Sequence, residues 1–174
     1  HKITMALHDF SRFNNVNLEG SRVVGFVKNA GYQSLAFTGV QVLNPEVLTP
    51  IESGKYSCII DHYKALLADG QEIQSCRVDG CFWSDMGTVD DYLELHQGIL
   101  TGEVPCWAEI EDVRKPYCIS QKAKLPAYLQ LNDWVSIGEA EVGNKSHIER
   151  SVIWDDVVVE GGQTILDAII SSNR

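Results

Sequence analysis

The sequence predicts a two-part fold: an α/β part over about the first 105 residues, followed by a short left-handed parallel β-helix of hexapeptide repeats. Strand-like and helix-like apolar patterns alternate over residues 1–100. From residue 117 the long helical periodicity disappears, and apolar residues arrive every five or six positions. The composition, 44% hydrophobic and 22% charged over 174 residues, is that of a globular protein able to bury a core.

The first part is expected to be a mixed sheet with at least two helices. Apolar runs and alternating patterns predict strands at residues 1–7, 23–27, 34–43 and 72–78. Helical signals lie at residues 45–48, 57–68 and 90–100. Asn44 is the expected N-cap of the first helical segment, with Pro45 at its first helical position, and Gly70 ends the second segment. The elements therefore alternate in the manner of an α/β or α+β domain.

In the second part, residues 117–174, a single apolar residue recurs every five or six positions, and turn-forming residues lie between these repeat positions, which we call beats. The beats fall at Ile119, Leu125, Leu131, Ile137, Val142, Ile148, Ile153, Val159 and Ile165. Three such beats make one triangular coil, so about three coils are expected. A left-handed coil departs from the usual right-handed rule for parallel connections. Antiparallel hairpins are the alternative for this segment, and residues 106–116 are expected to link the two parts.

The net charge limits the classes of binding partner that are expected. With 14 basic and 24 acidic residues the formal charge is −10, and no cluster of Lys and Arg stands out, so neither nucleic acid nor an anionic membrane is an expected partner. No apolar run approaches the length of a membrane helix and no signal peptide is visible, which favours a cytoplasmic protein. The five cysteines form no CxxC pair and are expected to be reduced thiols; a disulfide between Cys76 and Cys81 is the alternative.

The most informative stretch is CFWSDMGTVDDYL at residues 81–93. It resembles the aromatic-x-Asp-x-Gly-Thr segment of the sugar-1-phosphate nucleotidyltransferases. AFTGVQVL at residues 36–43 resembles the sugar-contacting strand of that family, and DFSRFN at residues 9–14 and SVIWD at residues 151–155 also match it. The following helix and hexapeptide tail resemble the mannose-1-phosphate guanylyltransferase-like branch. The resemblance covers nearly all of the chain, as the C-terminal portion of such an enzyme.

The resemblance implies a Rossmann-like nucleotidyltransferase domain, of which residues 1–105 would be the C-terminal part. It also implies transfer of a nucleotidyl group from a nucleoside triphosphate to a sugar 1-phosphate, with release of pyrophosphate. Asp85 would then be the catalytic carboxylate and a ligand of Mg²⁺, which prefers carboxylate and phosphate oxygens. Thr38, Gly39, Trp83 and Gly87 would contact substrate.

Each of these residues also has an ordinary structural explanation. An Asp-x-Gly sequence is a common turn, and Thr88 is a good N-cap for the next helix, whose first turn holds Asp90 and Asp91, both expected to face solvent. A glycine inside a strand often marks a bulge, which applies to Gly39, and Trp83 has the character of a core or pocket-wall aromatic.

The family's glycine-rich triphosphate loop with its Arg, its second metal-binding Asp and its Glu-Lys-Pro motif are absent from the sequence. The first residues read as a strand in progress without Met, so these parts are expected upstream, and the chain alone is expected to be inactive. Two other functions stay open. The β-helix could be a regulatory or oligomerisation module, forming a homo-oligomer, or the chain could be a hexapeptide-repeat acyltransferase with His147 as base.

Overall fold

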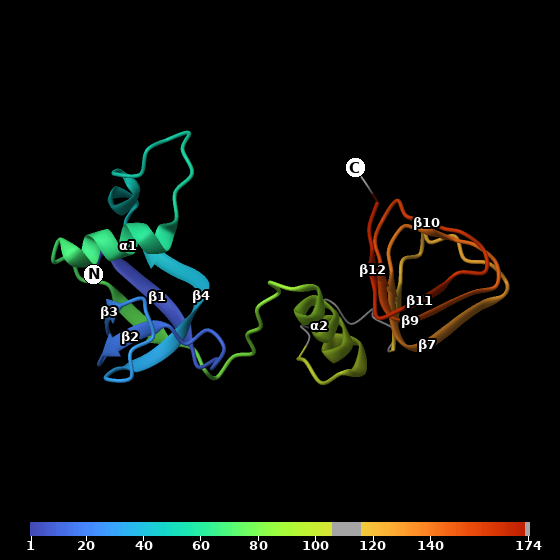
Figure 1. Cartoon of the computed structure of the whole chain (residues 1–174), viewed down its shortest axis with the longest axis horizontal. Coiled ribbons are helices and arrows are strands. Elements are labelled where there is room, and N and C mark those ends of the chain that lie inside the picture. Colours follow the sequence, from blue (N-terminus) through green and yellow to red (C-terminus); the bar gives the residue numbers. More distant parts are fainter. Residues whose placement is uncertain (106–115, 173–174) are drawn as a thin grey trace. The chain divides into compact units, whose positions relative to one another are not determined.

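A computed structural model describes residues 1–105 and 116–172 of the chain (Figure 1). Its contacts divide the chain into two units, His1–Trp83 and Ser84–Arg174. The first unit is built around a closed barrel of five strands with the order β1-β4-β2-β3-β5. The strands are β1 (Ile3–His8), β2 (Val16–Glu19), β3 (Arg22–Gly25), β4 (Gln33–Leu43) and β5 (Gln74–Arg77).

Alternating burial along β1 supplies part of the barrel core. In β1 every second side chain, from Ile3 through Met5 to Leu7, is buried, as the sequence predicts. β1 pairs with β4 in antiparallel fashion and with β5 in parallel, so the sheet is mixed, as expected. These inward side chains form one apolar core with residues of the other strands and of the helix that follows.

The short helical segment begins where the sequence places it, and the first α-helix begins two residues after the expected start at residue 57. The side chain of Asn44 accepts a hydrogen bond from the Glu46 amide at 3.0 Å, and Pro45 opens a 3-10 helix, η1 (Pro45–Leu48). Helix α1 (Ile59–Ala68) packs Tyr63 into the barrel core, where its hydroxyl donates to Gln41 Oε1 at 2.7 Å. Burial raises the pKa of the Tyr63 hydroxyl.

Helix α2 (Val89–Thr101) belongs to the second unit. Its Leu100 is buried with Trp134 and Val152, which lie on strands β7 (Leu129–Ile137) and β9 (Ser146–Ile153). Because this apolar face packs on β-strands that come later in the chain, the division by contacts falls after Trp83. From the sequence, the α/β part is expected to extend to about residue 105, which includes α2.

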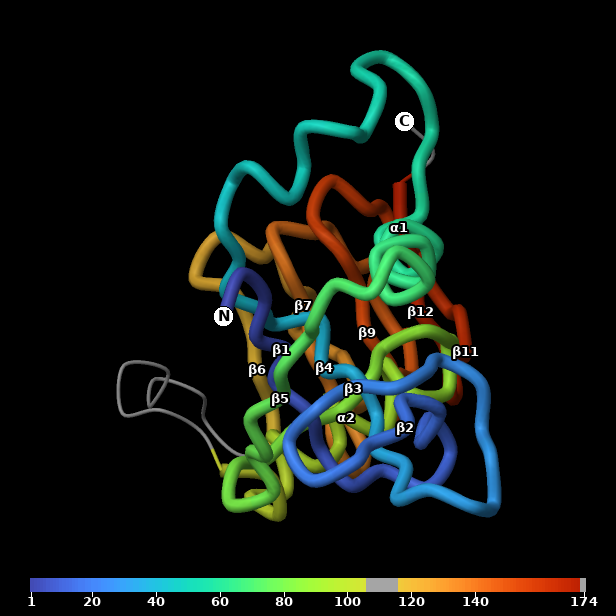
Figure 2. Tube along the Cα trace, turned by 90° about the vertical axis from the view of Figure 1, so that its left-hand side faces the viewer, coloured from blue at the N-terminus to red at the C-terminus, as the bar shows by residue number. Residues whose placement is uncertain are grey.

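Residues 117–170 form a parallel β-helix, traced in yellow to red in Figure 2. Besides β7 and β9, its strands are β6 (Tyr117–Ile119), β8 (Glu141–Val142), β10 (Val158–Val159), β11 (Thr164–Leu166) and β12 (Ile169–Ile170). All the strand pairs described in this segment are parallel, with partners 16 to 18 residues apart. The segment therefore makes about three coils of three hexapeptides, and the hairpin alternative is wrong.

The predicted beats line the interior of the coils, with a gradient toward the first coil. Ile148 is 0% exposed and lies in register with Leu131 and Ile165 of the neighbouring coils. In contrast, Ile119 and Leu125 of the first coil are 37% and 38% exposed. Each coil is covered by its neighbours. The middle coil has a neighbour on both sides, so its interior side chains are the least exposed to solvent.

Two corners of the β-helix require particular residues. A side chain at Gly143 would place Cβ 2.6 Å from Gly161 Cα of the next coil, so only glycine fits this close approach. At another corner Asp133, Arg150 and Asp167 share a left-handed backbone conformation. Arg150 donates to Asp133 Oδ2 at 2.8 Å and to both carboxylate oxygens of Asp167 at 2.6 and 2.8 Å, which joins three successive coils.

The remaining sequence expectations concern the linker and the cysteines. Apart from Pro116, the expected linker 106–116 lies outside the described residues. Cys76 and Cys81 are free thiols, so the disulfide alternative is wrong. Among the described helices, none combines the length and the apolarity needed to span a bilayer.

Candidate functional site

Thr38 and Gly39 form a bulge in strand β4. The pairing of β1 with β4 shifts register between Met5 and Leu7, and the Thr38 hydroxyl spans this irregularity. It donates to the Ala6 carbonyl at 2.9 Å and accepts from the Val40 amide at 3.2 Å. Gly39 has a φ of 85°, which explains the glycine, and a Cβ there would meet no atom within 4 Å. The bulge therefore leaves open space above Gly39, while the Thr38 hydroxyl is already engaged.

Trp83 is bound to the same bulge. Its indole N–H donates to the Thr38 carbonyl at 3.2 Å, and its ring lies edge-on to Phe10 with centroids 5.3 Å apart. The His8 ring is 6.0 Å from the same indole. These contacts explain why an aromatic residue precedes the Asp-x-Gly sequence: it anchors the end of the first unit to the β1–β4 pair.

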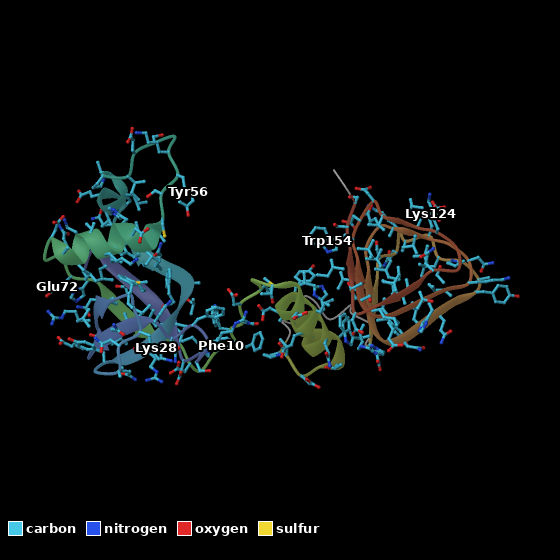
Figure 3. The ribbon with its side chains drawn as sticks, in the orientation of Figure 1. Phe10, Lys28, Tyr56, Glu72, Lys124 and Trp154 are labelled. Atoms are coloured by element: carbon cyan, nitrogen blue, oxygen red, sulfur yellow. The ribbon has the colours of Figure 1, made fainter. Side chains whose placement is uncertain are left out.

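A pocket in the first unit, lined mainly by residues with polar side chains, was not foreseen from the sequence. Its volume is about 510 Å³, enough for a small ligand, and it lies where the loop after β1 faces the β3–β4 loop. Its lining includes Ser11, Asn14, Lys28, Asn29 and Tyr32. Lys28, labelled in Figure 3, makes no ion pair with any described residue and therefore brings an uncommitted cation to the pocket. The residues that line this pocket lie mainly in loops, which carry no periodic sequence pattern. The adjacent polar residues Lys28 and Asn29 are the one sequence signal that could have indicated it.

Asp85 and Gly87 form a tight turn before α2. Asp85 Oδ2 accepts the Gly87 amide at 3.0 Å, while Oδ1 accepts no hydrogen bond from the described residues. A side chain at Gly87 would place Cβ 2.6 Å from Asp85 Oδ2 and would displace the carboxylate. The glycine therefore keeps one carboxylate oxygen fixed and the other available.

Thr88 caps α2, as its residue type predicts. Its Oγ1 accepts the Asp91 amide at 3.1 Å and donates to Asp91 Oδ2 at 2.7 Å. The expectation that Asp91 merely faces solvent, like Asp90, is therefore wrong, since Asp91 is part of the cap.

The turn could supply one ligand to a divalent cation. No group of three or more His, Cys, Asp or Glu side chains with metal-binding geometry occurs among the described residues. A single carboxylate with an open oxygen still fits Mg²⁺, which commonly takes one or two carboxylates and completes its shell with water and substrate phosphates.

The five residues expected to form the site fall into two groups. Thr38, Gly39 and Trp83 are in contact within the first unit, and Asp85 and Gly87 are in contact within the second. That they act together stays a prediction.

His147, the base of the acyltransferase alternative, lies on strand β9 of the β-helix, with 27% of its side chain exposed. Its Nε2 is 3.1 Å from Asn132 Nδ2 and 3.4 Å from Glu149 Oε2. Asn132 belongs to the neighbouring coil, so the three side chains form a polar cluster that joins two coils. This placement favours a structural role for His147.

The comparisons with known proteins agree with these motifs. Residues 11–102 match the family model described as "Nucleotidyl transferase". The chain is also 31% identical over 129 residues to a mannose-1-phosphate guanylyltransferase of Mycobacterium tuberculosis (strain ATCC 25618 / H37Rv). That match takes in 73% of this chain and 36% of the relative, so the chain spans little more than a third of the relative's length. With over half of its residues matched by the model, the chain belongs to the nucleotidyl transferase family and is like the sugar-1-phosphate nucleotidyltransferases within it.

Proposed function

We propose that this chain is part of an enzyme that transfers a nucleotidyl group from a nucleoside triphosphate to a sugar 1-phosphate and releases pyrophosphate. The observation that carries the proposal is the turn at Asp85 and Gly87, with one carboxylate oxygen open, inside the segment matched by the family model. The β-helix would be left-handed, and the first unit would be part of a Rossmann-like catalytic domain.

In this reaction a phosphate oxygen of the sugar phosphate attacks the α-phosphorus of the triphosphate, and the bond to pyrophosphate breaks. The protein mainly has to position two polyanions and offset the charge that builds up between them. Asp85 would hold Mg²⁺ through its open oxygen, and the ion would supply positive charge to the phosphates. Gly87 would hold the carboxylate in place.

The polar pocket of the first unit is a suitable place for the sugar phosphate. Lys28 could donate to the phosphate, while Tyr32 and Ser11 offer hydroxyl groups for hydrogen bonds to the sugar. The Asn14 amide already accepts from the Phe10 amide at 2.9 Å and donates to Asp9 Oδ1 at 2.7 Å, so it shapes the loop. Gly39 and Trp83 lie at the β4 bulge and not in the lining of this pocket, so their contact with substrate rests on the family resemblance. Thr38 would act by shaping the bulge, because its hydroxyl is engaged with the backbone.

The test compares Asp85→Asn with Asp90→Asn in the longest natural form of the protein that carries a triphosphate loop. Both changes remove one carboxylate charge, but Asp90 is an exposed residue in the first turn of α2. We expect turnover to fall by about 10² or more for Asp85→Asn, given the several kcal/mol that a positioned cation contributes. The Mg²⁺ concentration needed for half-maximal rate should rise for this variant, while Asp90→Asn stays near normal. Equal behaviour of the two variants would refute the assignment.

The 174-residue chain by itself should not catalyse the reaction. Its sequence contains no glycine-rich loop with an Arg to hold the triphosphate, and the leaving group needs such donors. The measurement is pyrophosphate release by the purified chain with nucleoside triphosphates and a panel of sugar 1-phosphates. Release above background would contradict this expectation.

A further inference from the structure

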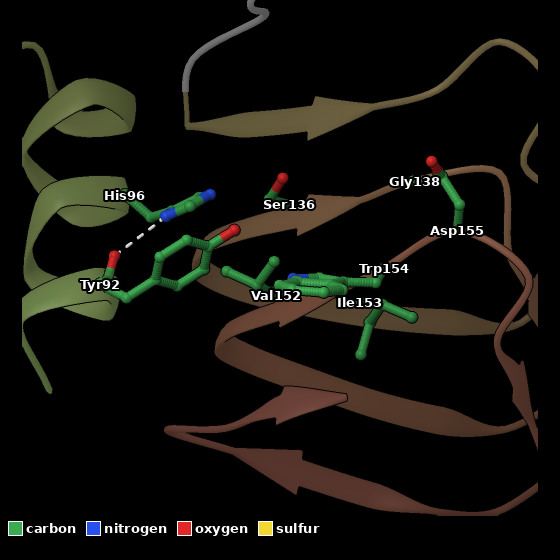
Figure 4. A pocket seen from close by; sticks show the side chains of 8 residues that line it. All are labelled: Tyr92, His96, Ser136, Gly138, Val152, Ile153, Trp154 and Asp155. Carbon is green, nitrogen blue, oxygen red and sulfur yellow. Dashed lines mark hydrogen bonds between the residues drawn. The ribbon is translucent and has the colours of Figure 1, made fainter. Parts of the chain in front are cut away.

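A second pocket lies within the second unit, between α2 and the outer face of the β-helix (Figure 4). Its volume is about 340 Å³, enough for a small organic molecule. The residues that matter here are Tyr92 and His96 from α2, Ser136 from β7, Val152 from β9, and Trp154 and Asp155 just after β9. None of them belongs to the candidate site described above.

Aromatic rings form an open corner on this pocket. The Tyr92 and Trp154 centroids are 6.4 Å apart with their planes inclined at 57°. Tyr92 is held from its other side by His96, whose ring is 4.3 Å away and whose Nδ1 is hydrogen-bonded to the Tyr92 carbonyl at 2.9 Å. Trp154 is 49% exposed. A large aromatic surface is thus held in place and left partly uncovered.

A carboxylate, that of Asp155, also lines the pocket, on its Gly138 side (Figure 4). Asp155 Oδ1 accepts the Glu139 amide at 2.6 Å, which fixes the carboxylate, while no bond to Oδ2 occurs among the described residues. None of the described Lys and Arg side chains lines the pocket. Lys122 approaches Asp155 but forms its ion pair with Glu139, at 2.6 Å. The pocket lining therefore carries a carboxylate and, among the described residues, no Lys or Arg side chain.

We propose that this pocket binds a small organic ammonium ion. Ring faces attract cations that lie within about 6 Å of their centroids, and two tilted rings in a pocket that also holds a carboxylate suit such an ion. The 6.4 Å separation lets one cation satisfy that limit for both Tyr92 and Trp154. Asp155, on the Gly138 side of the same pocket, supplies opposite charge at longer range, and Ser136 offers a hydroxyl for a polar group on the same ligand.

The experiment uses the 174-residue chain with choline as the probe and 3,3-dimethylbutan-1-ol, its uncharged isostere, as the comparison. Binding is followed by calorimetry or by the ligand methyl signals in NMR. We expect choline to bind about tenfold or more tightly than the isostere, a ratio within the range of cation–π and charge effects at partly desolvated sites.

Three variants make the test specific. Trp154→Ala should weaken choline binding about tenfold, as loss of the better cation–π partner implies. Asp155→Asn keeps an oxygen for the Glu139 amide, so it should weaken choline while leaving the isostere unchanged. Tyr128→Ala removes a 73% exposed aromatic of the same unit outside the pocket and should change neither.

Equal binding of choline and the isostere would show an apolar groove without ammonium recognition and would overturn the proposal. The proposal would also be overturned if choline did not bind at concentrations up to about 50 mM, because weaker binding would not amount to specific recognition. A loss with Tyr128→Ala as large as that with Trp154→Ala would place any binding elsewhere and would likewise overturn it. The outcome is independent of the proposed nucleotidyl transfer, because no substrate of that reaction is used.

Discussion

Replacing Ile148 with alanine tests whether the middle coil stabilises the β-helix. Ile148 is 0% exposed and is stacked between Leu131 and Ile165. The change removes three carbons, which at about 0.8 kcal/mol each amounts to roughly 2.4 kcal/mol of lost transfer free energy. The cavity left behind adds to this, because stacked coils on both sides limit collapse, so we expect about 3–4 kcal/mol in all.

The matched control is Leu125→Ala, which removes the same number of carbons from a beat of the first coil that is 38% exposed. It should cost about 1 kcal/mol or less, since much of the side chain already contacts water. Both free energies of unfolding are measured by urea titration, with Trp134 and Trp154 of this unit as the fluorescence probes. Equal losses for the two variants would refute the view that burial is greatest in the middle coil.

Two further predictions concern the corners of the β-helix. Gly143→Ala should destabilise the β-helix by about 1–3 kcal/mol in the same titration, because the added Cβ would press on the Gly161 backbone. In the control Gly162→Ala the added Cβ meets no atom within 4 Å, so the free energy of unfolding should fall by only about 1 kcal/mol, owing to the positive φ at this position. At the ion-paired corner, Arg150 lowers the pKa of the Asp167 carboxyl in the folded chain. The ion pair should therefore stabilise the folded state fully above the ordinary Asp pKa of about 3.9, and this stabilisation should be lost as the pH falls through the lower pKa of the folded state. Thermal unfolding of Asp167→Asn, followed from about pH 6 down to about pH 2, should lack this acid-dependent part, and a profile identical to that of the unchanged chain would contradict it.

Local chemistry made several elements predictable from the sequence. Asn44 with Pro45, and Thr88 before α2, are capping signals that act within a few residues, and both caps form as expected. The six-residue beat likewise led to parallel coils, because apolar residues at that spacing can share one interior only by stacking.

The candidate site was predictable only in part. The resemblance at residues 81–93 indicated Asp85 and Gly87, and the structure adds the reason for the pair: the glycine leaves room for the carboxylate that accepts its amide. The engagement of the Thr38 hydroxyl with the Ala6 carbonyl could not be foreseen, since it depends on a register shift between strands and joins residues 32 positions apart in the chain.

Most of the elements, the helix caps, the change to a repeating β-structure after residue 117 and the family were readable in the amino-acid sequence, whereas strand β2 was missed. Three features instead depended on how the chain packs: α2 lies on the β-helix, Lys28 lines a pocket with Asn14, and Tyr92 meets Trp154 beside Asp155. The physical reason is how far along the chain each kind of interaction reaches. Caps, turns and periodicity act over a few neighbouring residues, whereas pockets arise where distant segments are brought together by packing that no local pattern encodes.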